Sequence, residues 1–159
     1  MDNQAKSDLL NKLTYGLYVL TSQDGDARGG MLVTWVTQAS FEPPLLAVAV
    51  LSTAHTTEVM KKSATFALNF MADEQRNQAA AFGKKFAKVG DKLSGFPYHA
   101  GAATGSPILD DALGYLECRI TGWLPGGDHD VALAEIVDAQ LNRDSALMTT
   151  VSAGMSYAG

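Results

Sequence analysis

The sequence predicts a mostly β fold in one domain over residues 1–159, with six or seven antiparallel strands closed into a barrel and two or three short helices. The apolar segments are short, many are rich in β-branched and aromatic residues, and Gly, Pro or Asp separates them. A chain of 159 residues fits a single domain, and we find no internal repeat, linker or low-complexity tract. Closure into a barrel is the simplest arrangement because it removes exposed sheet edges.

The first two strands form a hairpin. Residues 16–21 (GLYVLT) predict the first strand, and Asp24-Gly25 is a strong turn signal. Residues 31–41 then predict one long returning strand. Glu42-Pro43-Pro44 ends it, because proline has no backbone donor and restricts the residue before it.

Two further strands enclose a short helix. Residues 45–51 (LLAVAVL) are apolar on both faces, which suits a strand buried from both sides, and residues 65–70 (TFALNF) are similar. The segment 56–62 predicts the helix, with Thr56 as its candidate cap and Glu58 in its first turn.

The second half continues the β pattern after one helix and one long loop. The helix is expected at 73–82 and is followed by Gly83, while the glycine-rich segment 82–107 predicts a long ordered loop. The remaining expected elements are strands at 115–121 and 131–139, a turn at 125–128, and a short last strand at 146–150. Clean alternation along 115–121 indicates that one face of that strand is buried.

Composition excludes several classes of protein. A formal net charge of −5 disfavours nucleic-acid binding, and no apolar run approaches the ~20 residues that cross a bilayer. The N-terminus lacks the basic-then-apolar order of a signal peptide. The single cysteine, Cys118, excludes an internal disulfide framework. We therefore expect a soluble cytoplasmic protein in which Cys118 is a core residue.

Common catalytic motifs are absent. There is no G-x-G-x-x-G after a strand, no Walker-type lysine loop and no G-x-S-x-G elbow. His55, His99 and His129 are far apart in the chain, and no Cys or His pair has metal-ligand spacing, so no metal site is predicted.

Small polar residues gather instead in three segments. Segment 29–40 (GGMLVTWVTQAS) combines a glycine pair, which permits close backbone approach, with hydroxyl and amide groups that suit a flat heterocycle. Composition alone favours the other interpretation, an ordinary strand with threonines on its solvent-exposed face.

The other two segments have two interpretations each. Segment 52–57 (STAHTT) precedes a helix and is either a phosphate site or an ordinary helix cap. Segment 126–130 (GGDHD) presents His129 either to a ligand or to solvent. Four lysines of the long loop could also reach a phosphate or be merely solvated: Lys84, Lys85, Lys88 and Lys92.

Taken in order, these motifs resemble the flavin reductase-like family, the FMN-binding split barrels, over roughly residues 14–148. The matching motifs are Val19–Thr21, Gly30-Met31, Thr34, Ser40, Glu42-Pro43-Pro44, Ser52 with His55, Thr56 and Thr57, Phe66–Asn69, Asp91-Lys92-Leu93 with Gly95, Leu116-Glu117-Cys118, and Gly127-Asp128-His129. Where many relatives have a second small serine this chain has Trp35, and where they often have arginine it has His55. Trp35 within Thr-Trp-Val-x-Gln-Ala-Ser-Phe is most similar to the flavin reductase-like part of flavodiiron proteins.

The resemblance implies a flavin held largely by residues 30–44. The implied cofactor-binding residues are Met31, Leu32, Val33, Thr34, Trp35, Gln38, Ala39, Ser40, Ser52, His55, Thr56 and Lys92. The backbone of 31–34 and the side chains of Thr34, Gln38 and Ser40 would meet the ring and ribityl chain. His55, Thr56 and Lys92 would lie near the phosphate. His129, the candidate catalytic residue, would lie near the approach of the nicotinamide.

The resemblance also implies the function. The leading hypothesis is a homodimeric flavin reductase that uses NADH or NADPH, carries FMN, and passes electrons to an acceptor. The alternative, suggested by Trp35, is a flavin-binding electron carrier that a redox protein partner reduces. A cofactor-free or haem-binding barrel that serves as an interaction module is a third hypothesis.

Overall fold

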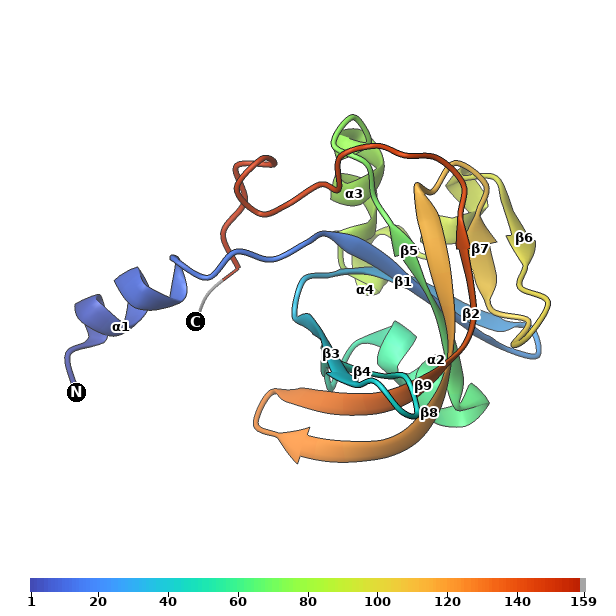
Figure 1. The fold of residues 1–159 in the computed structure, drawn as a ribbon, viewed down its shortest axis with the longest axis horizontal. Helices are drawn as coiled ribbons and strands as arrows, with labels where there is room; N and C mark the ends of the chain where they lie inside the picture. The colour runs from blue at the N-terminus through green and yellow to red at the C-terminus, as the bar shows by residue number, and fades with distance from the viewer. Residues whose placement is uncertain (158–159) are drawn as a thin grey trace.

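Seven antiparallel strands form one curled sheet in the order β2-β1-β5-β8-β9-β4-β3 (Figure 1). A computed structural model gives this arrangement and describes residues 1–157. The strands are β1 (Tyr18–Asp24), β2 (Ala27–Val33), β3 (Val36–Ser40), β4 (Leu45–Leu51), β5 (Thr65–Phe70), β8 (Gly114–Gly126) and β9 (His129–Leu141). A separate two-stranded sheet pairs β6 (Tyr98–Ala100) with β7 (Pro107–Leu109). The prediction of a mostly β fold is therefore confirmed.

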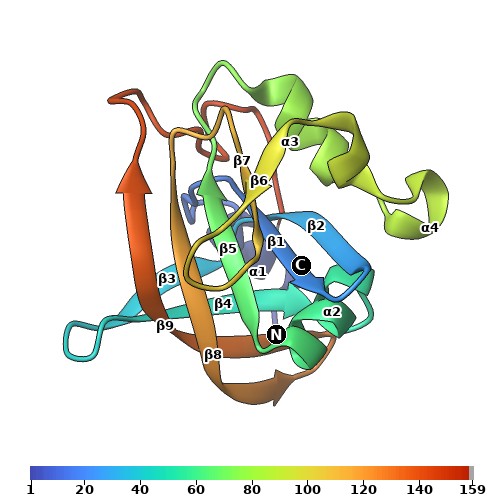
Figure 2. The same ribbon diagram turned by 90° about the vertical axis from the view of Figure 1, so that its right-hand side faces the viewer.

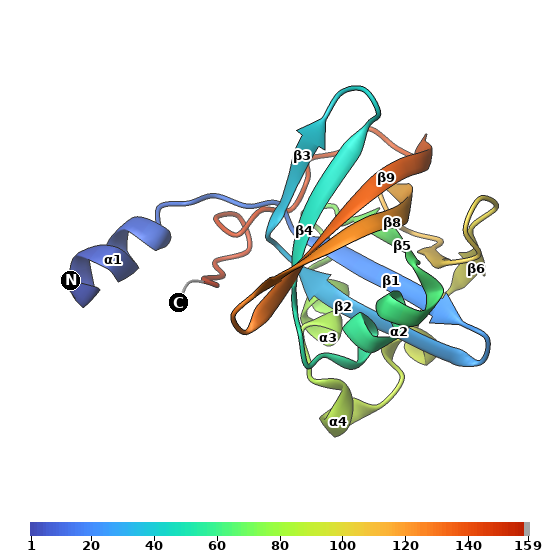
Figure 3. The same ribbon diagram turned by 90° about the horizontal axis from the view of Figure 1, so that it is seen from below.

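The two edge strands of the large sheet, β2 and β3, follow one another in the chain with only Thr34 and Trp35 between them. Three Cα steps, from Val33 to Val36, span at most about 11 Å. In a flat sheet, six strand spacings would separate the edges by about 29 Å. The sheet must therefore curl until its edges approach, as Figures 2 and 3 show. Among residues 1–157 no ladder joins β2 to β3, so closure of the barrel stays a prediction.

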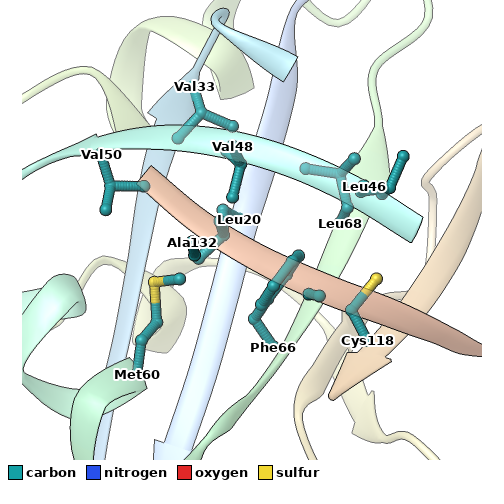
Figure 4. Packing of buried hydrophobic residues seen from close by; sticks show 11 residues of the cluster. Leu20, Val33, Leu46, Val48, Val50, Met60, Phe66, Leu68, Cys118 and Ala132 are labelled. Atoms are coloured by element: carbon teal, nitrogen blue, oxygen red, sulfur yellow. The ribbon is translucent and has the colours of Figure 1, made fainter. Parts of the chain in front are cut away.

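The inside of the curl holds the main hydrophobic core (Figure 4). Residues of β4 alternate along the strand between buried and half-buried. Leu46 and Val48 point inward and share the core with Phe66 of β5. The prediction that β4 is buried from both sides was therefore wrong for one face, because the outer side chains of this strand have no second layer over them.

The helices surround the sheet unevenly. They are α1 (Asn3–Leu10), α2 (His55–Ser63), α3 (Arg76–Phe82), α4 (Phe86–Val89) and a 3-10 turn η1 (Lys92–Gly95). Helix α3 and η1 cover a second core that includes Leu17, Phe82 and Leu93. Helix α1 has no buried residue and projects away from the sheet (Figures 1 and 3). None of these helices within residues 1–157 is long and apolar enough to span a membrane.

Three predictions need correction: the strand at 31–41, the number of helices and the cap at Thr56. The single strand expected at 31–41 is two strands, because the chain leaves one edge of the sheet after Val33 and joins the other at Val36. Residues 1–157 contain four α-helices rather than the two or three expected. Thr56 does not cap α2; Ala54 occupies the cap position, and its methyl side chain makes no capping hydrogen bond.

The second half also differs from expectation in places. The segment 82–107 contains α4, η1 and β6 rather than loop alone. Residues 146–150 make isolated bridges, such as Ala72 with Leu147, instead of a strand. Strand β8 continues through Gly126, so the turn begins only at Gly127, whose φ of +81° suits glycine. The Asp24-Gly25 turn is confirmed, with Asp24 paired to Ala27.

Candidate functional site

The junction Thr34–Trp35 connects the two free edges of the sheet. The Thr34 carbonyl accepts a hydrogen bond from the amide of Val36 at 3.0 Å, and the Trp35 carbonyl accepts one from Ala49 at 3.0 Å. Thr34 is only 7% exposed. Each edge strand keeps a row of N–H and C=O groups without a strand partner on its open side. The open edges thus offer backbone donors and acceptors to a planar ligand with polar edges.

The predicted residues of β2 offer backbone rather than side chains. Val33 is a member of the main core, and Met31 packs against the same core. Leu32 points the opposite way and packs against the second core. The side chains of Met31, Leu32 and Val33 therefore pack on the two cores and leave the main chain as the part of this strand that a ligand could meet.

The glycine pair before them has an internal role. A Cβ on Gly29 would lie 2.8 Å from the Cα and Oγ1 of Thr56, and one on Gly30 would lie 2.6 Å from Cε1 of Phe82. The close approach that these glycines permit is therefore made by α2 and α3. Neither glycine has room that is reserved for a ligand.

The three predicted residues of β3 lie further along the edge. Gln38 and Ala39 are exposed, and Ser40 is half-buried next to a bulge in the pairing with β4. Ser40 pairs with Leu45, at the far end of β4 from Leu51. Six residues of strand cover about 20 Å, so only an elongated ligand could contact both Ser40 and the loop after Leu51.

An aromatic cluster of Trp35, His129 and Tyr157 lies at the other end of β3. The Trp35 ring centroid is 4.8 Å from that of His129 and 5.2 Å from that of Tyr157. The predicted residue Ser52 is held beside it, because both its amide and its hydroxyl donate to the carbonyl of Asp128, at 3.0 and 2.6 Å. The structure therefore brings together Trp35, Ser52 and His129, three of the candidate residues.

Hydrogen bonds fix the imidazole within this cluster. Nδ1 of His129 lies 2.8 Å from a carboxylate oxygen of Asp128, and Nε2 lies 3.1 Å from the Tyr157 hydroxyl. An ionised carboxylate can only accept, so Nδ1 donates to Asp128, while Nε2 shares a hydrogen bond with the Tyr157 hydroxyl. The hydrogen bond from His129, together with its charge, lowers the pKa of Asp128.

A second group of polar residues surrounds the start of α2. Nε2 of His55 lies 3.0 Å from the carbonyl oxygen of Arg28, and its ring stacks on Phe86 with centroids 3.8 Å apart. The Arg28 side chain pairs with Asp91 at 2.6 Å. His55 is therefore fixed between β2 and α4 and is not a freely rotating side chain.

The amino end of α2 lies next to this group and has features that favour an anion. Its cap residue Ala54 provides no side-chain acceptor, so the first amides of the helix are not satisfied by a capping side chain. These amides and the helix dipole favour an anion such as phosphate. The hydroxyls nearby are engaged: Thr57 donates to the Leu51 carbonyl at 2.8 Å, and buried Thr56 packs on Gly29.

Lys92 has a structural role that its sequence position did not reveal. Its ammonium group donates to the carbonyls of Phe82 and Lys84, each at 2.8 Å. These bonds hold together the two ends of the segment that contains α4. Burial lowers its pKa below the ordinary lysine value. One of its three N–H donors is left for an anion.

Two features of the wider chain limit the chemistry of the site. Residues 1–157 hold no group of three His, Cys, Asp or Glu side chains that could bind a metal ion. Burial, and then the charge of Glu117, raise the pKa of the Cys118 thiol to about 12. Cys118 is thus a core residue and not a nucleophile at neutral pH.

Three contacts of the site had no signal in the sequence. Tyr157, Phe86 and Arg28 reach the predicted residues from distant segments or by a backbone carbonyl, and no local motif marks them. Residues 51–56 connect the aromatic cluster to the polar group at the start of α2, because Leu51 pairs with His129 and His55 begins α2. Leu51 and His55 thus place the free strand edges, the aromatic cluster and the start of α2 on neighbouring parts of the chain.

Comparison with known proteins gives a consistent set of matches. A family model described as "Flavin reductase like domain" matches residues 10–155. Diflavin flavoprotein A 1 of Synechocystis sp. is 34% identical over 140 residues, which cover 87% of this chain and 24% of the relative. The chain spans about a quarter of the length of the curated relatives it matches.

Solved structures share the fold. BorF, the flavin reductase component of a bacterial two-component tryptophan halogenase, has a TM-score of 0.84 at 22% identity, covering 96% of this chain and 95% of its own. An NADH:FAD oxidoreductase of Streptomyces globisporus has a TM-score of 0.81 at 26% identity, covering 89% and 83%.

Proposed function

This chain belongs to the flavin reductase-like domain family, and on that premise we propose that it binds FMN along the edges of β2 and β3 and catalyses hydride transfer from NADH or NADPH to the flavin. The observation that carries the proposal is the junction Thr34–Trp35, where two free sheet edges meet beside an aromatic cluster and an uncapped helix end. FMN, when bound, supplies the hydride-accepting chemistry. Electrons then pass to an acceptor.

In this proposal the protein binds and orients. The backbone of 31–34 and the side chains of Thr34, Gln38 and Ser40 hold the ring and ribityl chain. The first amides of α2, with His55 and Lys92, hold the phosphate. His129 flanks the place where the nicotinamide stacks. Hydride transfer needs positioning rather than an acid or base, which agrees with a site of binding groups.

Anaerobic spectroscopy tests the proposal directly. We expect the purified protein, loaded with FMN, to lose its visible flavin absorbance when NADH or NADPH is added. Parallel titrations with FAD and with each nucleotide measure the preferences. FMN-loaded protein that neither nucleotide bleaches would contradict the reductase function.

A second candidate function is a flavin-binding electron carrier that a protein partner reduces. The chain covers only about a quarter of relatives whose names describe them as diflavin flavoproteins. Trp35 beside His129 also supplies an aromatic contact surface at the site. Tight FMN binding with fast reduction by a redox protein, and no NAD(P)H turnover, would favour this alternative.

The proposal includes a homodimer and a closed barrel in a single domain. Ala47 of β4 and Leu133 of β9 face each other across the ladder on the outer side of the sheet, opposite to the core. Leu124 of β8, on the same side, is 67% exposed. This apolar outer face would pack against a second copy. The unpaired, buried Cys118 suits a reducing compartment such as the cytoplasm.

A further inference from the structure

Tyr157 belongs to a segment that returns to the site from the opposite side of the molecule. The segment is firmly anchored at its start: Met148 is fully buried, its amide donates to Met71, and its carbonyl accepts from Leu17, both at 2.8 Å. Two residues later the amide of Thr150 donates to Tyr15 at 2.8 Å. The chain up to Thr150 is therefore part of the packed body.

Beyond that point the attachment weakens. Gly154 has a φ of +63°, which turns the chain, and the amide of Met155 donates to Thr150 at 2.9 Å. The Ser156 hydroxyl donates a hydrogen bond to the side-chain oxygen of Asn11, in the connector after α1. Met155 and Tyr157 are 41% and 50% exposed. Figure 1 shows this segment running beside the connector, outside the curled sheet.

The end of this segment covers the imidazole. His129 directly follows the exposed turn residues Gly127 and Asp128, yet its side chain is only 11% exposed. The neighbours of the imidazole are the rings of Trp35 and Tyr157, and its Nε2 atom is hydrogen-bonded to the Tyr157 hydroxyl. Tyr157 thus forms a hydrogen bond with Nε2 of His129 and also covers part of the Trp35 ring.

We propose that residues 154–157 form a strap that closes over Trp35 and His129, with the Tyr157 ring occupying the place where a nicotinamide ring would stack. The inference rests on the proposed function, because it assumes that the nicotinamide approaches beside His129. Two flat rings cannot share this place. Binding of the nucleotide therefore requires the strap to swing outward about Gly154, and the anchored residues up to Thr150 do not move.

The strap makes a quantitative prediction about affinity. A site that is closed for roughly 70–90% of the time binds its ligand about three- to tenfold more weakly than an open one. Removal of the Tyr157 ring should therefore strengthen nucleotide binding by the same factor. A tyrosine that instead formed a permanent wall of the nicotinamide site would have the opposite effect, since its loss would weaken binding.

Steady-state flavin reduction by Tyr157→Ala and Tyr157→Phe tests the strap. We expect Tyr157→Ala to lower the KM for the preferred nucleotide by about three- to tenfold, with little change in kcat. Tyr157→Phe keeps the ring but loses the hydroxyl, so its KM should lie between those of Tyr157→Ala and the wild type. Val151→Ala, in the same segment but 71% exposed, is the matched control and should behave as wild type.

The outcomes separate the strap from the function on which it rests. A KM that is unchanged or raised in Tyr157→Ala, in a protein that still reduces flavin, overturns the strap alone. A wild-type protein that binds FMN but is not reduced by either nucleotide overturns the proposed function, and the strap with it. A fall in KM for Val151→Ala equal to that for Tyr157→Ala would also contradict the assignment to Tyr157.

Discussion

Trp35 occupies a position at which a single residue connects several parts of the site. Its carbonyl accepts a hydrogen bond from an amide of β4. Its ring contacts the rings of His129, in β9, and of Tyr157. A large aromatic residue in a strand is most often a core residue. Here the strand is interrupted at Trp35, so the ring lies at the junction of two sheet edges and not in the core.

Thr34→Lys tests the ligand site at the scale of one residue. Thr34 is 7% exposed at the junction, so a lysine there would fill the proposed ring site with a long charged side chain. We expect loss of FMN retention, measured by fluorescence titration. Thr14→Lys, at an exposed threonine of the connector after α1, should bind FMN as the wild type does.

A folding control accompanies this comparison, since a buried lysine can also unfold the chain. Circular dichroism should show the same β content in both variants. A folded Thr34→Lys protein with undiminished FMN content would mean that the ring lies elsewhere.

At the residue scale, the chemical type of a residue suggests that it could contact a ligand, but it does not show which contacts that residue makes within the protein. The sequence predicts Ser52, His55 and His129 as neighbours of a ligand; in the structure Ser52 is hydrogen-bonded to Asp128, next to His129, and His55 is hydrogen-bonded to Arg28 of β2. The sequence could not show that Lys92 binds two carbonyls, or that Tyr157 covers His129, because no local pattern of residue types marks either contact.

At the scale of elements, the interruption between β2 and β3 decides where the site lies. Hydrophobic alternation predicts strands but does not indicate where a strand changes its partner. Residues 31–41 therefore resemble one strand, whereas β2 pairs with β1 and β3 pairs with β4. The helix at 56–62 and the strands at 45–51 and 65–70 were predicted closely, since their patterns depend on neighbours in the sequence.

Buried Glu117 shows how one element positions another. Its carboxylate, fully buried on β8, accepts hydrogen bonds from the amides of Ala103 and Thr104, at 3.1 and 2.8 Å, and from the Thr104 hydroxyl at 2.6 Å. A Cβ on Gly101 would lie 2.2 Å from this carboxylate. Through the Glu117 carboxylate, the Leu-Glu-Cys motif therefore holds the loop between β6 and β7.

Glu117→Gln should destabilise the protein markedly. The amide group of glutamine places N–H donors against the backbone donors of the loop, and a buried unsatisfied polar group costs about 1–3 kcal/mol. Urea denaturation should show a fall of about 2 kcal/mol in the free energy of unfolding. Glu135→Gln, on the half-buried outer face of β9, should change it by less than about 0.5 kcal/mol. Equal stabilities of the two variants would refute the role given to Glu117.

At the scale of the whole molecule, the curled sheet has a packed inside and an apolar outside. Leu46, Val48 and Ala134 fill the inside, while Ala47 and Leu133 lie on the outer face. The sequence shows that β4 is apolar on both faces but does not show what covers each face. Burial from both sides within one chain was the wrong inference, and a second copy is the proposed cover.

Leu133→Glu tests this assembly. Leu133 is 36% exposed, and burying a charge there against an apolar partner is unfavourable. Light scattering should show a dimer for the wild type and a monomer for Leu133→Glu. Ala80→Glu, on the exposed face of α3, is the charge-matched control and should remain dimeric. A monomeric wild type, or a Leu133→Glu protein that stays dimeric, would disprove the interface.

The central claim is that FMN lies along the edges of β2 and β3, and amide NMR shifts during a titration with FMN measure this without any substitution. We expect the largest shifts in Met31–Trp35 and in Ser52–Thr56, with smaller ones near Gln38 and His129. Shifts confined to other regions, such as the outer sheet face or the connector after α1, or the absence of any shift, would contradict the account.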